Sequence, residues 1–114
     1  MKNGQVLNKM KHYILNNGVE IPAVAFGTYK AADGKSADVI RTAIEAGYRY
    51  FDTASFYGTE TYLAEAVRES GIARDEIFIA SKLWKTEMGY DNVKSAFRRT
   101  LDNLKTDYLD LYLI

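Results

Sequence analysis

The 114-residue sequence predicts the α/β class, with parallel strands joined by right-handed helical crossovers. Two observations support this prediction. Short, nearly all-apolar segments recur along the chain, and the stretches between them place apolar residues three and four positions apart, as in amphipathic helices. A hydrophobic content of 47% and an aromatic content of 13% are sufficient for the packed core of one domain.

The N-terminal segment 1–11 is polar and rich in lysine, which is typical of a loose leader. A hairpin is expected next, because residues 12–15 and 19–21 flank an Asn-Asn-Gly turn at 16–18, and Asn-Gly accommodates positive φ. Pro22 is expected to end this pairing, since proline has no N–H to donate.

Strands and helices then alternate. Strands are predicted over 24–26, 48–52, 77–82 and 108–114. Ser36 and Thr59 are expected to cap the first two helices, which Gly47 and Gly71 would terminate, and Asp91 would begin the third. The buried helical side chains would be Val39, Ile40, Ala43 and Ile44, then Leu63, Ala66 and Val67, then Val93, Phe97, Leu101 and Leu104.

The sequence ends at or within its fourth predicted strand, with no helix after it. Because edge strands are normally covered or polar, the chain is expected to be truncated there.

Composition excludes several classes of partner. Fifteen Lys and Arg residues balance fifteen Asp and Glu residues, so neither nucleic acid nor a membrane surface is expected. The sequence has no cysteine, hence no disulfide and no thiolate metal site, which suits a reducing compartment. No apolar segment has the length of a signal peptide or membrane span, so a cytoplasmic location is expected.

Asp52, Tyr57 and Lys82 lie at or just after the ends of predicted strands, where a parallel sheet gathers its reactive groups. A nearby ammonium favours tyrosinate, so Lys82 is expected to lower the pKa of Tyr57 from its usual value of about 10. Such a phenol can donate a proton to a carbonyl oxygen. Each residue alone is more often structural than functional, and only their joint placement favours a site. Regular alternation would put Asp52, Tyr50 and Tyr48 on one face and Phe51 toward the helices.

The segment 47–60 (GYRYFDTASFYGTE) resembles the first signature of the aldo-keto reductases. Residues 79–84 (IASKLW) resemble the family's lysine strand, and residues 107–114 (DYLDLYLI) resemble the strand that leads to its catalytic histidine. The hairpin before Val24 is similar to the family's barrel-bottom plug, and residues 26–28 (FGT) to its first strand end. The likeness extends to bacterial small-carbonyl and diketogluconate-type reductases.

This resemblance implies the N-terminal part of a (β/α)8 TIM barrel with a β-hairpin plug, about four parallel strands and three helices. Residues 12–114 would form this partial barrel domain, truncated after its fourth strand, and residues 1–11 the polar leader.

The resemblance also implies reduction of an aldehyde or ketone to an alcohol by NADPH, with NADH left open. Tyr57 would be the general acid, Lys82 would lower its pKa, and Asp52 would hold Lys82 charged and in place. The other implied contacts are to the cofactor, from Gly27, Thr28, Tyr29 and Asp52, and to the substrate, from Phe56 and Trp84. No metal is implied, and Trp84 could equally be a core residue.

Three positions depart from the family pattern: Tyr50 replaces a frequent histidine, Thr59 a common asparagine, and Ala64 a frequent glycine. The family's catalytic histidine would follow Ile114, so the 114-residue chain by itself is expected to be inactive. His12 is expected to be a surface residue.

Two other functions stay open. The chain could be a non-catalytic half-barrel that associates with the missing C-terminal half or with a copy of itself, since an open half-barrel exposes apolar surface. It could also keep the fold without turnover, like the barrel-shaped auxiliary subunits of potassium channels in the same superfamily. The carbonyl substrate itself stays open among small sugars, ketoacids, glyoxals and aromatic aldehydes.

Overall fold

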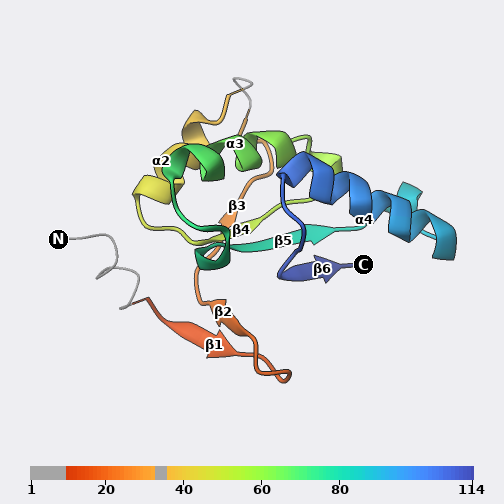
Figure 1. The fold of residues 1–114 in the computed structure, drawn as a ribbon, viewed down its shortest axis with the longest axis horizontal. Coiled ribbons are helices and arrows are strands. Elements are labelled where there is room, and N and C mark those ends of the chain that lie inside the picture. The colour runs from red at the N-terminus through yellow and green to blue at the C-terminus, as the bar shows by residue number, and fades with distance from the viewer. Residues whose placement is uncertain (1–9, 33–35) are drawn as a thin grey trace.

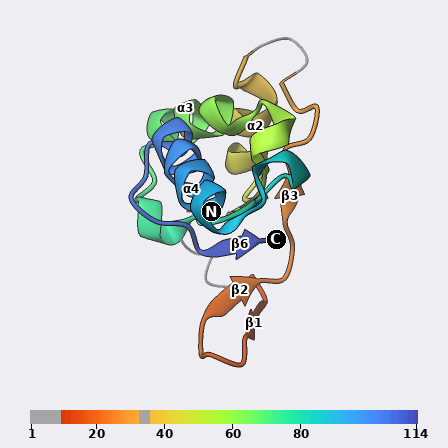
Figure 2. The ribbon, with the colours of Figure 1, turned by 90° about the vertical axis from the view of Figure 1, so that its right-hand side faces the viewer.

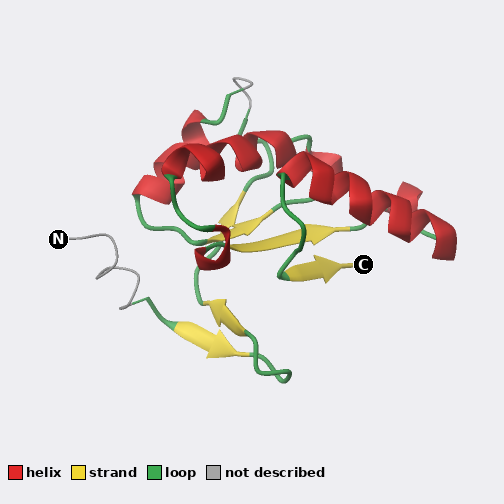
Figure 3. Ribbon diagram, viewed as in Figure 1, coloured by secondary structure: helices red, strands yellow, loops and turns green. Residues whose placement is uncertain are grey.

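The computed structural model describes residues 10–32 and 36–114. Most of the predicted polar leader therefore lies outside the described residues. The described chain forms a two-stranded hairpin and a four-stranded parallel sheet whose α-helices cover one face (Figures 1 and 3). The hairpin lies on the opposite side of the sheet from the helices, as two perpendicular views show (Figures 1 and 2).

The hairpin pairs β1 (His12–Ile14) with β2 (Glu20–Pro22) in antiparallel register. Pro22 is the last residue of the ladder, as expected, but its missing N–H is not what ends the pairing. Pro22 lies opposite His12, and beyond it the backbone N of Ala23 still donates to the carbonyl of Lys11 at 2.9 Å. In an antiparallel ladder alternate residue pairs exchange no hydrogen bonds, so the missing N–H of proline costs nothing at this position.

The parallel sheet has the order β3-β4-β5-β6, which is also the order along the chain. Its strands are shorter than predicted: β3 (Phe26–Gly27), β4 (Tyr50–Asp52), β5 (Phe78–Lys82) and β6 (Leu111–Leu113). The register places Gly27 beside Asp52 and Lys82 beside Leu113. The carboxyl ends of all four strands therefore meet at one edge.

The helices α2 (Asp38–Glu45), α3 (Glu60–Ser70) and α4 (Tyr90–Leu104) follow β3, β4 and β5 in turn. The described connections contain the short 3-10 turns η1 (Ser55–Tyr57), η2 (Arg74–Glu76) and η3 (Lys85–Glu87). Among the described residues, no helix combines the length and the apolar character needed to cross a membrane.

Glycines end the turn and the helices as predicted. Gly18, Gly47 and Gly71 have φ values of 87°, 110° and 72°, which side chains with a Cβ rarely adopt. Of the two predicted N-cap residues, Thr59 precedes its helix as expected and Ser36 does not. Ala37 precedes α2, so Ser36 lies one residue too early, and the Thr59 side chain makes no capping hydrogen bond.

The hydrophobic core lies between the helices and one face of the sheet. Phe51 is fully buried there, as alternation predicts, together with Ile40 of α2 and Leu63 of α3. Two predicted positions are wrong. Val39 is 53% exposed, because the short helix α2 contacts the sheet through the narrower stripe of Ile40, Ala43 and Ile44. Tyr48 precedes β4 and packs on Phe26 at the helix side, so strand alternation does not extend to it.

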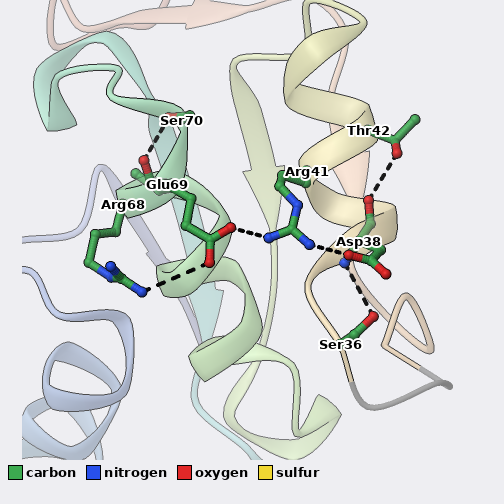
Figure 4. A network of polar contacts seen from close by, with 8 residues as sticks. Ser36, Asp38, Arg41, Thr42, Arg68, Glu69 and Ser70 are labelled. Atoms are coloured by element: carbon green, nitrogen blue, oxygen red, sulfur yellow. Dashed lines mark hydrogen bonds and ion pairs between the residues drawn. The ribbon is translucent and has the colours of Figure 1, made fainter.

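Arg41 joins the first two helices at their surface. Its guanidinium donates to Asp38, three residues earlier on α2, and to Glu69 on α3 (Figure 4). All three side chains are substantially exposed, so solvent screens the pairs and their net stabilisation is small.

Candidate active site

The side chains of Asp52, Tyr57 and Lys82 meet at the carboxyl edge of the sheet. Asp52 ends β4, Lys82 ends β5, and Tyr57 ends the η1 turn that follows β4. The Lys82 Nζ donates to Asp52 Oδ1 at 2.7 Å and to Tyr57 Oη at 3.2 Å, and also to the backbone carbonyl of Thr53 at 3.1 Å. The structure thus brings together the three residues that the sequence singles out.

The environment of Lys82 keeps it charged. Burial, the largest single influence, would lower the pKa of Lys82, but the hydrogen bonds to Asp52 and Tyr57 and the Asp52 charge raise it above its ordinary value. The Lys82 and Asp52 side chains are 29% and 32% exposed, so the pair is shielded but accessible. The Lys82 ammonium also lies 5.0 Å from the centre of the Tyr57 ring.

The residues predicted to contact a cofactor lie at the end of β3, beside this trio. Gly27 pairs with Asp52, and a Cβ added to Gly27 would meet open space. Tyr29 is exposed, and its ring centroid lies 4.9 Å from that of Tyr57. Thr28 is fully buried, and both its backbone N and its hydroxyl donate to the carbonyl of Asp52.

Phe56 and Trp84, predicted to line a substrate pocket, form a stacked pair near the trio. Their ring centroids are 4.1 Å apart and their planes differ by 12°. Phe56 is 55% exposed and Trp84 is half-buried, so neither ring is an ordinary core residue. His12 lies in the exposed hairpin and does not belong to this cluster.

A threonine cluster adjoins the backbone of Asp52, and sequence reasoning missed it. The Thr59 hydroxyl lies 2.9 Å from that of Thr28 and 3.3 Å from that of Thr53, and all three residues are buried. The Thr28 hydroxyl donates to the backbone carbonyl of Asp52, and the backbone carbonyl of Thr53 accepts a hydrogen bond from Lys82 Nζ. The Thr59 side chain points into this cluster, and this explains why it does not cap α3.

Glu60, the next residue, is a buried carboxylate at the start of α3. Its oxygens accept hydrogen bonds from Ser81 Oγ at 3.2 Å and Asn103 Nδ2 at 3.1 Å. Burial, the dominant influence, raises the pKa of Glu60, although these hydrogen bonds oppose the rise. The sequence alone gives no signal that Glu60 is buried and hydrogen-bonded, because its partners Ser81 and Asn103 are distant in the chain.

The raised pKa of Glu60 predicts a pH-dependent stability. Between the ordinary glutamate pKa of about 4.3 and the raised folded value, the unfolded chain loses this proton and the folded chain keeps it. Stability contributed by the protonated side chain therefore falls as pH rises through this window. Glu60→Gln keeps a neutral side chain at every pH, so in urea unfolding the stability of this variant relative to the wild type should increase as the pH rises above about 4. An identical pH slope in both proteins would contradict this.

A match to the aldo-keto reductase family model extends over residues 23–114, and the chain belongs to this family. A crystal structure of an aldo/keto reductase from Brucella melitensis superposes with a TM-score of 0.88 at 40% sequence identity, covering 93% of this chain and 41% of that one. The sheet, helices and hairpin thus form the N-terminal part of a (β/α)8 TIM barrel, as predicted.

Several curated proteins are similar to this chain in sequence. The glyoxal reductase of Bacillus subtilis is 45% identical over 101 residues, which cover 88% of this chain and 37% of the relative. The NADPH-dependent D-xylose reductase of Meyerozyma guilliermondii is 47% identical over 104 residues, covering 88% and 33%. The chain therefore spans about a third of the length of the curated relatives it matches.

Proposed function

We propose that the whole protein reduces an aldehyde or ketone to an alcohol with NADPH as hydride donor, NADH being the alternative. The observation that carries this proposal is the placement of the Lys82 ammonium, 2.7 Å from Asp52 and 3.2 Å from the Tyr57 phenol. Family membership supports it, as does the NADPH dependence in the name of the similar xylose reductase. The proposal assigns residues 12–114 to the barrel domain and residues 1–11 to a leader before it.

The residues at the end of β3 are compatible with a bound dinucleotide. The open space over Gly27 and the exposed ring of Tyr29 would accommodate it, next to Asp52. Thr28 is buried and its hydroxyl donates to the backbone carbonyl of Asp52, so it would support the cofactor site by holding the Asp52 backbone in place. When bound, the nicotinamide would supply the hydride that adds to the substrate carbonyl carbon.

Tyr57 would donate its phenolic proton to the carbonyl oxygen, which becomes the hydroxyl of the alcohol. Lys82 would stabilise the resulting tyrosinate through its charge, and solvent would return the proton to Tyr57. Asp52 would keep Lys82 protonated and directed at the phenol. The Phe56–Trp84 pair would line the substrate pocket.

The test is an assay of the whole protein with NADPH and a panel of small sugars, ketoacids, glyoxals and aromatic aldehydes. We expect carbonyl-dependent NADPH oxidation, with one alcohol formed for each NADPH consumed. A protein that binds NADPH and reduces no member of the panel would contradict the proposal.

The alternative of a half-barrel that associates without turnover is favoured by one observation. Leu113 and Ile114, at and just after β6, are 42% and 86% exposed. Exposed apolar side chains of this kind suit contact with a further part of a barrel or a second copy. The alternative predicts no carbonyl reduction in the same assay.

A further inference from the structure

The carboxylate of Glu87 lies where two loops of the candidate site meet. Glu87 ends η3, which follows β5, and its Oε1 accepts a hydrogen bond from Ser55 Oγ of η1 at 2.6 Å. The same oxygen accepts from the backbone N of Trp84 at 2.8 Å, and Oε2 lies 3.4 Å from Nη2 of Arg99 on α4. One side chain therefore connects the loop after β4, the loop after β5 and helix α4.

Glu87 is ionised although it is largely shielded from water. Its side chain is only 15% exposed. Burial, the largest single influence, would raise the pKa of Glu87, but the hydrogen bonds from Ser55 and Trp84 and the Arg99 charge lower it below the ordinary value. A shielded carboxylate is stable only when donors surround it, so this charge favours the loop arrangement that supplies those donors.

The aromatic pair lies directly on this connection. Phe56 is the neighbour of Ser55, and Trp84 donates its own backbone N–H to Glu87. Phe56 is more than half exposed, so burial alone does not hold its ring against Trp84. Stacking of two rings contributes only about 0.5–1.5 kcal/mol beyond the area buried. The hydrogen bonds of Glu87 thus join the two segments that carry the rings.

We propose that Glu87 is a positioning residue, whose carboxylate clamps η1 to η3 and thereby holds Phe56 and Trp84 together as one wall of the substrate pocket. Only the assignment of the two rings to a substrate pocket rests on the proposed function. The clamp is a property of this chain and can be measured without substrate.

Trp84 is the only tryptophan of the sequence, so its fluorescence reports on the clamp directly. We expect Glu87→Ala to increase acrylamide quenching of Trp84 and to reduce the ring-current shifts of Phe56, with little change in far-UV circular dichroism. Ser55→Ala should act in the same direction but more weakly. Glu87→Gln should fall between Glu87→Ala and the wild type, because its amide oxygen can still accept both hydrogen bonds but the negative charge is lost.

Glu45→Ala is the matched control, since it removes an exposed carboxylate at the C-terminal end of α2, outside the two loops. Wild-type quenching in Glu87→Ala, or an equal increase in the control, would overturn the clamp. In the whole protein, Glu87→Ala should raise KM for an aromatic aldehyde about tenfold, as expected for loss of a hydrogen bond to a charged group, with a smaller effect on kcat. A loss confined to kcat would overturn the positioning role, whereas absent turnover in the wild type would contradict only the proposed function.

Discussion

Tyr57→Phe is expected to lower carbonyl reduction by the whole protein by about 10²–10⁴-fold, the usual contribution of a general acid. The substitution removes only the phenolic oxygen, which lies 3.2 Å from Lys82 Nζ, and leaves the ring that packs against Tyr29. NADPH affinity should therefore change little, and the loss should appear in kcat and in kcat/KM. Steady-state kinetics together with fluorescence titration of NADPH would measure the two effects separately.

Tyr90→Phe is a suitable control, because Tyr90 is 82% exposed at the start of α4 and belongs to no part of the candidate site. It should retain wild-type turnover. Substantial turnover by Tyr57→Phe would remove Tyr57 from the role of proton donor, even if the protein proved to be a carbonyl reductase.

Arg74→Ala is expected to reduce the free energy of unfolding by about 2–3 kcal/mol, the range for a shielded charge that loses several hydrogen-bond partners. Arg74 Nε donates to Thr106 Oγ1 at 2.9 Å and Nη1 to the Ile77 carbonyl at 2.6 Å. Nη2 donates to the Tyr108 carbonyl at 3.0 Å and to Asp110 Oδ2 at 3.1 Å. One guanidinium thus joins the entry of β5 to the segment that leads into β6.

The loss of Arg74 would also leave Asp110 without its cation. The Asp110 carboxylate is only 22% exposed and accepts a further hydrogen bond from the backbone N of Ile79 at 2.9 Å. Urea denaturation would give the change in stability. Arg68→Ala, which removes a 75% exposed side chain 4.0 Å from Glu69, should cost less than about 0.5 kcal/mol. Equal effects of the two substitutions would show that the Arg74 hydrogen bonds contribute no special stability.

The alternation of elements could be predicted from the sequence, because hydrophobic period and terminating glycines are local properties. The helices at 38–45, 60–70 and 90–104 and the chain-order parallel sheet agree with it. The errors fall at element ends. The side chains of Ser36 and Thr59 have a strong local preference for capping helices, but neither caps one, because the surrounding structure decided the outcome instead.

The trio of Asp52, Tyr57 and Lys82 could also be predicted, because each lies at a strand end or in the turn directly after one, and parallel strands bring such ends to one edge. Its supporting residues could not be predicted. Thr59 meets Thr28 across 31 residues of sequence, Glu87 meets Ser55 across 32, and Glu60 meets Asn103 across 43. The sequence by itself therefore determined the class of fold, the family resemblance and the central residues. Only the tertiary structure decided which buried polar side chains hold them, because a hydrogen bond requires two groups within about 3 Å and no local pattern encodes such distant pairs.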